Sequence, residues 1–395
     1  MAITINPENA ASYYNRGLAK ANLKDHRGAV LDYDRAIDIN AKDALAYLGR
    51  GVSKSKQDDH RGALLDFGRA IELMPDDPQA YYYRGVSRSR IEQHRGALAD
   101  FTKSIELDPS SAQTYYIRGV TKQKLNEYAG SLPDFTKVIE ITPKRPQAYA
   151  SRGISAVNLN DFAKAILDLN KAIELNPTDA DSYFYRGYAK GKLDDYKNAL
   201  ADYDRAISLN NTNYGAYYGR GFCRSKLGDQ KGAVQDFNQA IEMNNVNVDS
   251  KVVYSGRLTR PILDNLRNLV QERSKISELS TERAEAYFSR GISKIKQGES
   301  KAALADLNKA IELNPAYAEA YFSRAMIKSA QGDQKTAIMD CNSSIKLSPA
   351  YAEVYYVRGI IKHSLGDENG GCLDLSKAGE LGYNPSYKVI SDYCN

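Results

Sequence analysis

Apolar and small side chains recur along this chain at the spacing of one face of an α-helix. A small residue, an aromatic or aliphatic residue and a second small residue stand four and three positions apart, as in Ala29, Tyr33 and Ala36. These spacings place all three side chains on one stripe of a helix. The stripe returns every 34 residues along most of the chain. The pattern therefore predicts one packing helix in each 34-residue unit.

A second set of positions precedes each stripe and predicts a second helix. Tyrosine is followed three residues later by arginine and then, in all but one unit, by glycine, as in Tyr13, Arg16 and Gly17. Tyrosine and glycine share a helix face, and the missing Cβ lets another helix approach closely. The tyrosine recurs in every regular unit, at Tyr13, Tyr47, Tyr81, Tyr115, Tyr149, Tyr183, Tyr217, Tyr287, Tyr321 and Tyr355.

Capping residues mark the start of the second helix of each unit, and stop residues mark its end. Acidic residues such as Asp25 and Asp59 stand where they can accept backbone N–H bonds at the start of the second helix. Proline follows the second helix in most units, as at Pro75 and Pro109, and stops it because proline lacks the N–H group. Each unit is therefore expected to fold as helix, turn, helix.

This 34-residue helix–turn–helix unit resembles the tetratricopeptide repeat over nearly the whole chain. The resemblance implies an all-α fold, a right-handed α–α superhelix with two antiparallel helices per repeat and the first helices on the concave side. We expect about ten regular repeats, one degenerate repeat and a C-terminal capping helix formed by residues 385–395.

The 34-residue period breaks once, between Arg220 and Arg290. We predict an N-terminal array of seven repeats over 1–245, preceded by the tail of a truncated repeat, and a C-terminal array of three repeats with its cap over 282–395. Residues 246–281 are interpreted as a degenerate repeat or linker helix. Its first part, Asn247–Val253, is expected to form helix poorly because it holds asparagine and β-branched residues. Simple repeat decay, a bend and a partner-specific insert all remain open.

The first residues suggest that the chain is a fragment of a longer protein. Ala2 to Pro7 matches Ala172 to Pro177, which ends a later repeat. The compartment therefore stays undetermined.

Charged residues occupy positions where the family carries apolar ones. Arginine stands in place of the usual leucine before the glycine, and a basic residue replaces the aromatic three positions after it in all regular units except at Ala156. An aspartate on the second helix accompanies the arginine in every regular unit. Because buried charges need partners, we predict structural ion pairs such as Arg16–Asp32 and Arg186–Asp202. A row of ligand-binding arginines is the alternative.

Composition and motifs narrow the possible chemistry. The net charge is +5, from 54 basic and 49 acidic residues that are interleaved, which makes nucleic-acid binding the weaker hypothesis. No apolar run is long enough to span a membrane. Three of the four histidines occupy one repeat slot, and the four cysteines show no close pairing, so we expect no metal site, no disulfide and buried thiols. No phosphate loop or catalytic triad is found, so we expect no cofactor and no enzyme activity.

A partner-binding surface is expected on the first helices, opposite the face that carries arginine and glycine. At about 100° per residue, this face takes the residue after each tyrosine and those four and eight positions further on. In the family it lines the groove that holds extended peptides; we call it the predicted groove face. Its first slot holds Tyr14, Tyr82, Tyr116, Phe184, Tyr218, Phe288, Phe322 and Tyr356, and its third slot holds Lys56, Arg90, Lys124, Lys192 and Lys226.

Aromatic area and steering lysines suit a protein or peptide partner with hydrophobic and acidic residues. The predicted function is therefore a non-enzymatic interaction scaffold. The family's two-carboxylate clamp is not expected, because Tyr14 and Leu18 stand where its first lysine and asparagine would be. Packing of the rings between repeats, a nucleic-acid groove, an assembly or sensor module of a larger protein, and self-association are the alternatives.

Overall fold

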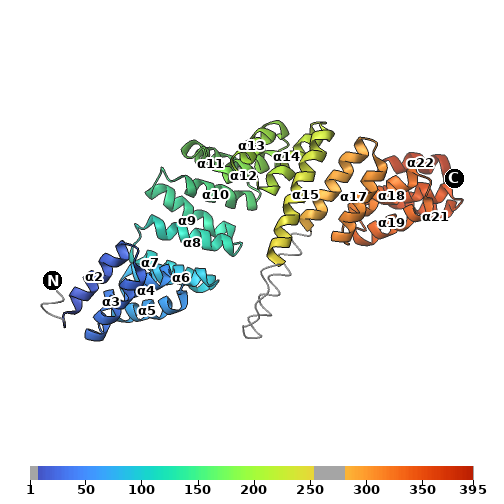
Figure 1. Cartoon of the computed structure of the whole chain (residues 1–395). Helices are drawn as coiled ribbons and strands as arrows, with labels where there is room; N and C mark the ends of the chain where they lie inside the picture. Colours follow the sequence, from blue (N-terminus) through green and yellow to red (C-terminus); the bar gives the residue numbers. More distant parts are fainter. Residues whose placement is uncertain (1–7, 253–280, 395) are drawn as a thin grey trace. The chain divides into compact units, whose positions relative to one another are not determined.

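The computed structural model describes residues 8–252 and 281–394, and in these two ranges the chain forms helices joined by short turns, without a strand (Figure 1). This confirms the expected all-α helical solenoid. The chain divides into two compact units, Met1–Ala189 and Lys190–Asn395, with the division inside α12. This division follows contact density rather than the repeat period, and the boundaries at 245/246 and 281/282 stay predictions.

The N-terminal unit is built from consecutive helix pairs, each pair joined by a turn of three residues. Its helices are α2 (Ala10–Asn22), α3 (His26–Ile39), α4 (Ala44–Lys56), α5 (His60–Leu73), α6 (Pro78–Arg90), α7 (His94–Leu107), α8 (Ala112–Lys124), α9 (Tyr128–Ile141), α10 (Pro146–Asn158), α11 (Phe162–Leu175) and the greater part of α12 (Ala180–Lys192).

The C-terminal unit continues the same pairing. Its helices are α13 (Tyr196–Leu209), α14 (Tyr214–Lys226), α15 (Gln230–Val252), a helical segment over 281–296, α17 (Ser300–Leu313), α18 (Ala318–Ala330), α19 (Gln334–Leu347), α20 (Ala352–Ser364), α21 (Glu368–Glu380) and α22 (Pro385–Tyr393). Among the helices that the structure describes, none combines the length and the apolar character that crossing a membrane requires.

Side-chain caps begin many of the second helices, as the sequence predicts. The Asp25 carboxylate accepts a hydrogen bond from the Gly28 amide at 2.8 Å, and Asp59 accepts one from Gly62 at 2.9 Å. The residue before this cap adopts a positive φ. It is a non-glycine residue such as Glu92 (φ 63°) in the earlier repeats, whereas Gly332 (φ 83°) fills the position in a later one. These local preferences fix the three-residue turn between the helices.

The stripe of small and aromatic residues forms the core of each repeat. Ala29, Tyr33 and Ala36 are buried, with at most 1% of their surface exposed. The glycine of the first helix packs directly against the ring: a Cβ on Gly51 would lie 2.6 Å from Cε1 of Phe67. The helices of one repeat therefore approach closely because this glycine lacks a side chain.

Two features of the C-terminal unit differ from the sequence-based expectations. Helix α15 continues through Val252, so residues 247–252 are helical although they were expected to form helix poorly. Asn245 stands in the slot that holds proline in several repeats, so no proline blocks the helix there. The missing proline does not by itself lengthen a helix, because α3 and α13 end with Ala41 and Asn211 in that slot. The rest of the expected degenerate repeat, 253–280, lies outside the described residues.

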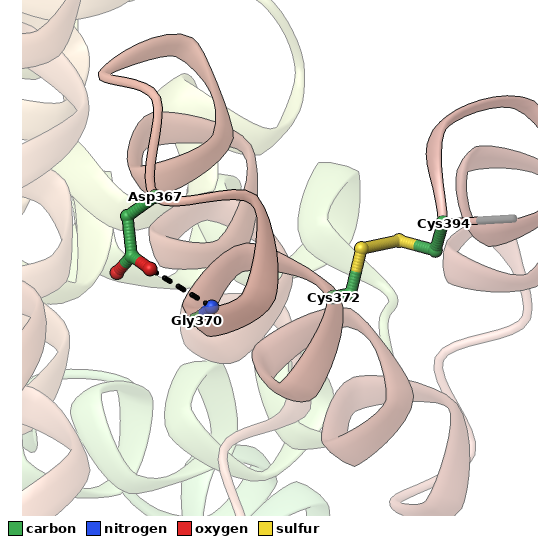
Figure 2. Close-up of a disulfide and its surroundings, with 4 residues drawn as sticks. All are labelled: Asp367, Gly370, Cys372 and Cys394. Atoms are coloured by element: carbon green, nitrogen blue, oxygen red, sulfur yellow. Dashed lines mark hydrogen bonds between the residues drawn. A yellow bond between two sulfur atoms is a disulfide. The ribbon is translucent and has the colours of Figure 1, made fainter.

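The second difference is a disulfide. Cys372 on α21 and Cys394 after α22 are bonded, with their Cα atoms 5.7 Å apart (Figure 2). The expectation of four unpaired thiols was wrong for this pair, because the turn between α21 and α22 folds the chain back on itself. Cys223 and Cys341 are buried free thiols, and burial raises their pKa to about 11 and about 12.

Candidate partner-binding face

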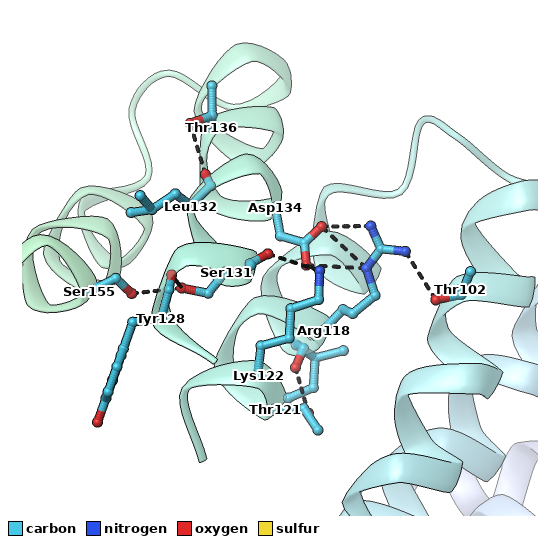
Figure 3. A network of polar contacts seen from close by, with 12 residues as sticks. Thr102, Arg118, Thr121, Lys122, Tyr128, Ser131, Leu132, Asp134, Thr136 and Ser155 are labelled. Carbon is cyan, nitrogen blue, oxygen red and sulfur yellow. Dashed lines mark hydrogen bonds and ion pairs between the residues drawn. The ribbon is translucent and has the colours of Figure 1, made fainter. Parts of the chain in front are cut away.

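In most helix pairs an aspartate with two cationic partners occupies the middle of the pair and sets the face that the first helix turns outward. Asp134 on α9 is 2% exposed at its side chain and receives Arg118 Nη2 at 2.6 Å and Lys122 Nζ at 2.9 Å, both from α8 (Figure 3). Arg16 and Lys20 approach Asp32 in the same way, at 2.6 Å and 2.8 Å. The arginine side chains are thus engaged inside the repeat, which favours the structural role over a row of ligand-binding arginines.

The electrostatics at Asp32 show why the carboxylate stays charged. Burial alone would raise the pKa of Asp32, but hydrogen bonds from Arg16 and Lys20 outweigh burial and hold the pKa below its ordinary value. The fifth repeat is the exception to this arrangement, because Ala156 leaves Asp168 with Arg152 as its cationic partner at 2.7 Å.

Most of these arginines also reach the preceding repeat, a contact that the sequence reasoning missed. Arg118 Nη1 donates to Thr102 Oγ1 at 3.2 Å (Figure 3), and Arg50 Nη1 lies 2.7 Å from Asp34 Oδ1. The sequence did hold a signal, since a polar residue follows two positions after most of the aspartates. The acceptors seen are Asp34, Thr102, Thr136, Asn170, Asp204, Asn238, Asn308 and Asn342.

The predicted Arg186–Asp202 pair would join residues of the two compact units and stays a prediction. Within the N-terminal unit, Arg186 Nη1 donates to Asn170 Oδ1 at 2.8 Å. Within the C-terminal unit, Asp202 pairs with Lys190 at 2.7 Å.

With arginine and glycine turned inward, the rings of the predicted groove face lie half-buried. In several of the earlier repeats the ring in the first slot packs against the core ring of the second helix in the same repeat. Tyr14 packs against Tyr33 in this way, with ring centroids 5.8 Å apart. In the C-terminal repeats the ring packs instead against a tyrosine that follows the second helix. The ring centroids of Phe322 and Tyr351, for example, are 5.2 Å apart. Each ring therefore has a packed edge and an accessible edge.

The cationic slot of the predicted groove face is exposed. Lys56, Arg90, Lys124, Lys192 and Lys226 all carry exposed side chains. Among the described residues, no carboxylate lies within ion-pair distance of Lys56, Arg90 or Lys124, in contrast to the inward-facing cations. These three charges are therefore available to an acidic partner.

Two of the predicted site residues meet in one cavity of about 560 Å³ in the N-terminal unit. Lys124 of α8 and Phe184 of α12 line it, together with residues of α9 and α10. The sequence reasoning did not single out Tyr128, Tyr185 or Asn158, which also line it. Four aromatic residues within Tyr183–Tyr188 were the available signal for this site.

Two family models match parts of this chain. Models described as tetratricopeptide repeat match residues 10–43, 112–145, 180–213, 214–247 and 318–351. A model described as TPR repeat matches 155–194 and 291–332, and together the matches cover more than half of the chain. The search among curated proteins gave no match.

Several solved structures are similar to parts of the chain. The structure of YrrB, titled a TPR protein with an unusual peptide-binding site, is 23% identical, covers 46% of this chain and 93% of its own, and has a TM-score of 0.42. MamA from Desulfovibrio magneticus RS-1 is 21% identical and covers 43% and 96%, with a TM-score of 0.41. A tetratricopeptide repeat protein from Parabacteroides merdae is 18% identical and covers 59% and 93%, with a TM-score of 0.46.

The assignment rests on the family-model matches and on the repeated helix pairs rather than on these structures. The five 34-residue matches begin at the first residues of α2, α8, α12, α14 and α18, in register with the helix pairs. The chain belongs to the tetratricopeptide repeat family.

Proposed function

We propose that this protein is a non-enzymatic interaction scaffold that binds a protein or peptide partner along the predicted groove face. Membership of the repeat family supports a role in protein–protein interaction. The observation that carries the finer proposal is the contrast between the two sets of cations. Lys122 forms an ion pair with Asp134. Lys124, two residues further along the same helix, is exposed and has no carboxylate within ion-pair distance among the described residues.

The half-buried rings supply the other part of the surface. Tyr82 packs one edge against Phe101 at 6.2 Å between centroids, and Tyr116 packs against Phe135 at 5.9 Å. Rings held in this way lose little conformational freedom on binding, so they suit anchors for a partner's apolar side chains. Exposed cations beside them favour partners that also carry acidic residues.

The test compares the predicted groove face with the outer surface of the second helices. One variant combines Tyr82→Ala, Tyr116→Ala and Arg90→Glu; the matched control combines Leu31→Ser and Leu65→Ser, which are 66% and 77% exposed on α3 and α5. Both proteins are used to capture partners from a lysate and are checked for helical content by circular dichroism.

We expect the first variant to lose partners that the wild-type chain and the control retain. Retention of every partner by a folded groove variant, or loss of partners in the Leu31/Leu65 control instead, would contradict the proposal. The second result would place the interaction on the outer surface.

A further inference from the structure

The cavity of the N-terminal unit lies where three successive first helices meet the predicted groove face. Val120 and Ile154 occupy the second slot of the face in the fourth and fifth repeats, and both line the cavity. The aromatic slot of the fifth repeat holds Ala150, the smallest residue in that slot anywhere in the chain. The face is therefore least filled between Tyr116 and Phe184, next to the cavity.

One wall of the cavity is aromatic, and its rings are held by contacts with other rings. Phe184 and Tyr185 of α12 contact each other edge-on with centroids 5.0 Å apart, and Tyr188 contacts Phe162 of α11 at 6.4 Å. Burial, then Asp181 and Tyr128, raise the pKa of Tyr185, and Tyr128 and Tyr185 line the same cavity. Because these rings are already held, an entering side chain needs little rearrangement of the wall.

The polar groups of the cavity are largely committed to the protein itself. The Gln123 amide donates to Ser151 O at 2.8 Å and to Ser155 Oγ at 2.9 Å. The Asn158 amide donates to the Ile154 carbonyl at 2.8 Å. These bonds hold the lining in place, and the surface that a ligand meets is mixed, with the larger share apolar.

Lys124 is the single charged residue among those that line the cavity. It is exposed. Burial, and after it the charge of Lys124, lower the pKa of His94. On α12, Asp181 raises the pKa of Tyr185, one of the aromatic residues of the wall, after the larger effect of burial. The lysine thus offers one positive charge to a cavity that is otherwise lined by uncharged aromatic, aliphatic and amide side chains.

We propose that this cavity is the anchor site for a bulky apolar side chain of an extended peptide, preferably aromatic, whose neighbouring acidic residue pairs with Lys124. The proposal rests on the proposed function and narrows it to one anchor. A volume of about 560 Å³ lies within the range of roughly 300–1,000 Å³ found for ligand sites. One cation in an apolar site matches a single carboxylate better than a phosphate, which takes several donors.

The probes are fluorescent peptides that differ at two positions only. The first contains Phe-Glu between Ser-Gly flanks, the second contains Ala-Glu and the third contains Phe-Lys. Fluorescence anisotropy with the full chain is expected to rank Phe-Glu first, with about a tenfold weaker affinity for each of the other two, since buried anchors dominate such contacts.

Two variants test the chamber and the charge separately. Ile154→Trp fills the cavity, and its control is Leu65→Trp, at an exposed position on the outer surface of α5. Lys124→Glu reverses the charge, and its control is Lys197→Glu, at an exposed lysine of the second helix α13. We expect Ile154→Trp to weaken Phe-Glu binding about tenfold, as the loss of an anchor site does. We expect Lys124→Glu to reverse the preference in favour of Phe-Lys, whereas both controls bind like the wild-type chain.

Several results would overturn the inference. Absence of a preference for Phe-Glu in the wild-type chain, or equal behaviour of the cavity variants and their controls, would remove the anchor site. Competition by N-acetyl-phenylalanine amide as strong as that by the peptide would make it a small-molecule site. Because Lys124 is exposed, Lys124→Glu keeps the test valid if Ile154→Trp fails to fold. Partner capture that depends on Tyr82 and Tyr116 but not on the cavity would leave the proposed function standing.

Discussion

The aspartate of each repeat is the residue on which the surface of the first helix depends. Asp134 is 2% exposed and holds Arg118 and Lys122 together, so it neutralises two cations that would otherwise be buried beside each other. The Arg118 contact to Thr102 then ties this network to the preceding repeat. Solenoid stability is a sum of repeat terms and nearest-neighbour terms, and this network contributes to both.

Removing that charge should destabilise the fourth repeat strongly. We expect Asp134→Asn to cost about 3 kcal/mol, because it leaves two partly buried cations without a carboxylate. Asp168→Asn should cost about half as much, since Asp168 is 13% exposed and pairs with Arg152 alone. Glu140→Gln, which breaks the exposed pair with Lys137, should cost less than about 0.5 kcal/mol.

Hydrogen exchange of the affected helix pairs measures these costs locally, which matters because long repeat arrays need not unfold in one step. Equal protection losses for Asp134→Asn and Glu140→Gln would contradict the prediction.

At the scale of one helix pair, the contact between glycine and the core ring sets the distance between helices. In the second repeat, Gly51 faces the Phe67 ring, which is fully buried. In the eighth regular repeat the ring is replaced by Leu307, and a Cβ on Gly291 would meet its nearest neighbour at an ordinary 3.4 Å. The next repeat already carries Ala325 in the glycine slot.

Gly51→Ala and Gly291→Ala should therefore have opposite effects. We expect Gly51→Ala to lower stability by about 1–3 kcal/mol, because the new methyl group would overlap the Phe67 ring. Gly291→Ala should be neutral or stabilising by up to about 1 kcal/mol, since alanine favours helix over glycine. Thermal denaturation followed by circular dichroism compares the two, and a similar loss for both variants would show that the ring contact does not decide the spacing.

These elements also show what the sequence could and could not predict. The glycine–ring contact and the Arg16–Asp32 spacing were visible because repeat copies place the same residues in phase. The Cys372–Cys394 bond was not visible in the sequence. The two cysteines are 22 residues apart, Cys394 lies beyond the last repeat, and the bond depends on the return of α22 onto α21. The cavity was missed for a related reason: its lining includes residues in which one repeat departs from the others. Tyr128 stands where the first three repeats carry histidine, and Asn158 stands in the cationic slot.

At the scale of the whole chain, the charges are numerous but mostly matched. The chain has 54 basic and 49 acidic residues, and the inward arginines and lysines are paired with aspartates. A few exposed cations such as Lys56, Arg90 and Lys124 remain on the predicted groove face. This distribution offers a peptide a small number of ionic contacts, whereas a nucleic acid would require a continuous basic stripe.

Salt dependence follows from that difference and separates the two classes of partner. Binding of the Phe-Glu peptide through one ionic contact should weaken by only about threefold to fourfold between 50 and 200 mM salt, because log affinity changes by roughly one unit of slope per contact. A nucleic-acid ligand with 6–10 phosphate contacts would lose roughly 10³–10⁵ in affinity over the same range. Titration of the full chain with the labelled peptide and with a labelled single-stranded oligonucleotide measures both. Tight oligonucleotide binding that is lost with salt, together with a peptide signal near zero, would favour the basic-groove alternative. A peptide affinity that weakens by only about threefold to fourfold is the result that the cavity and its single lysine predict.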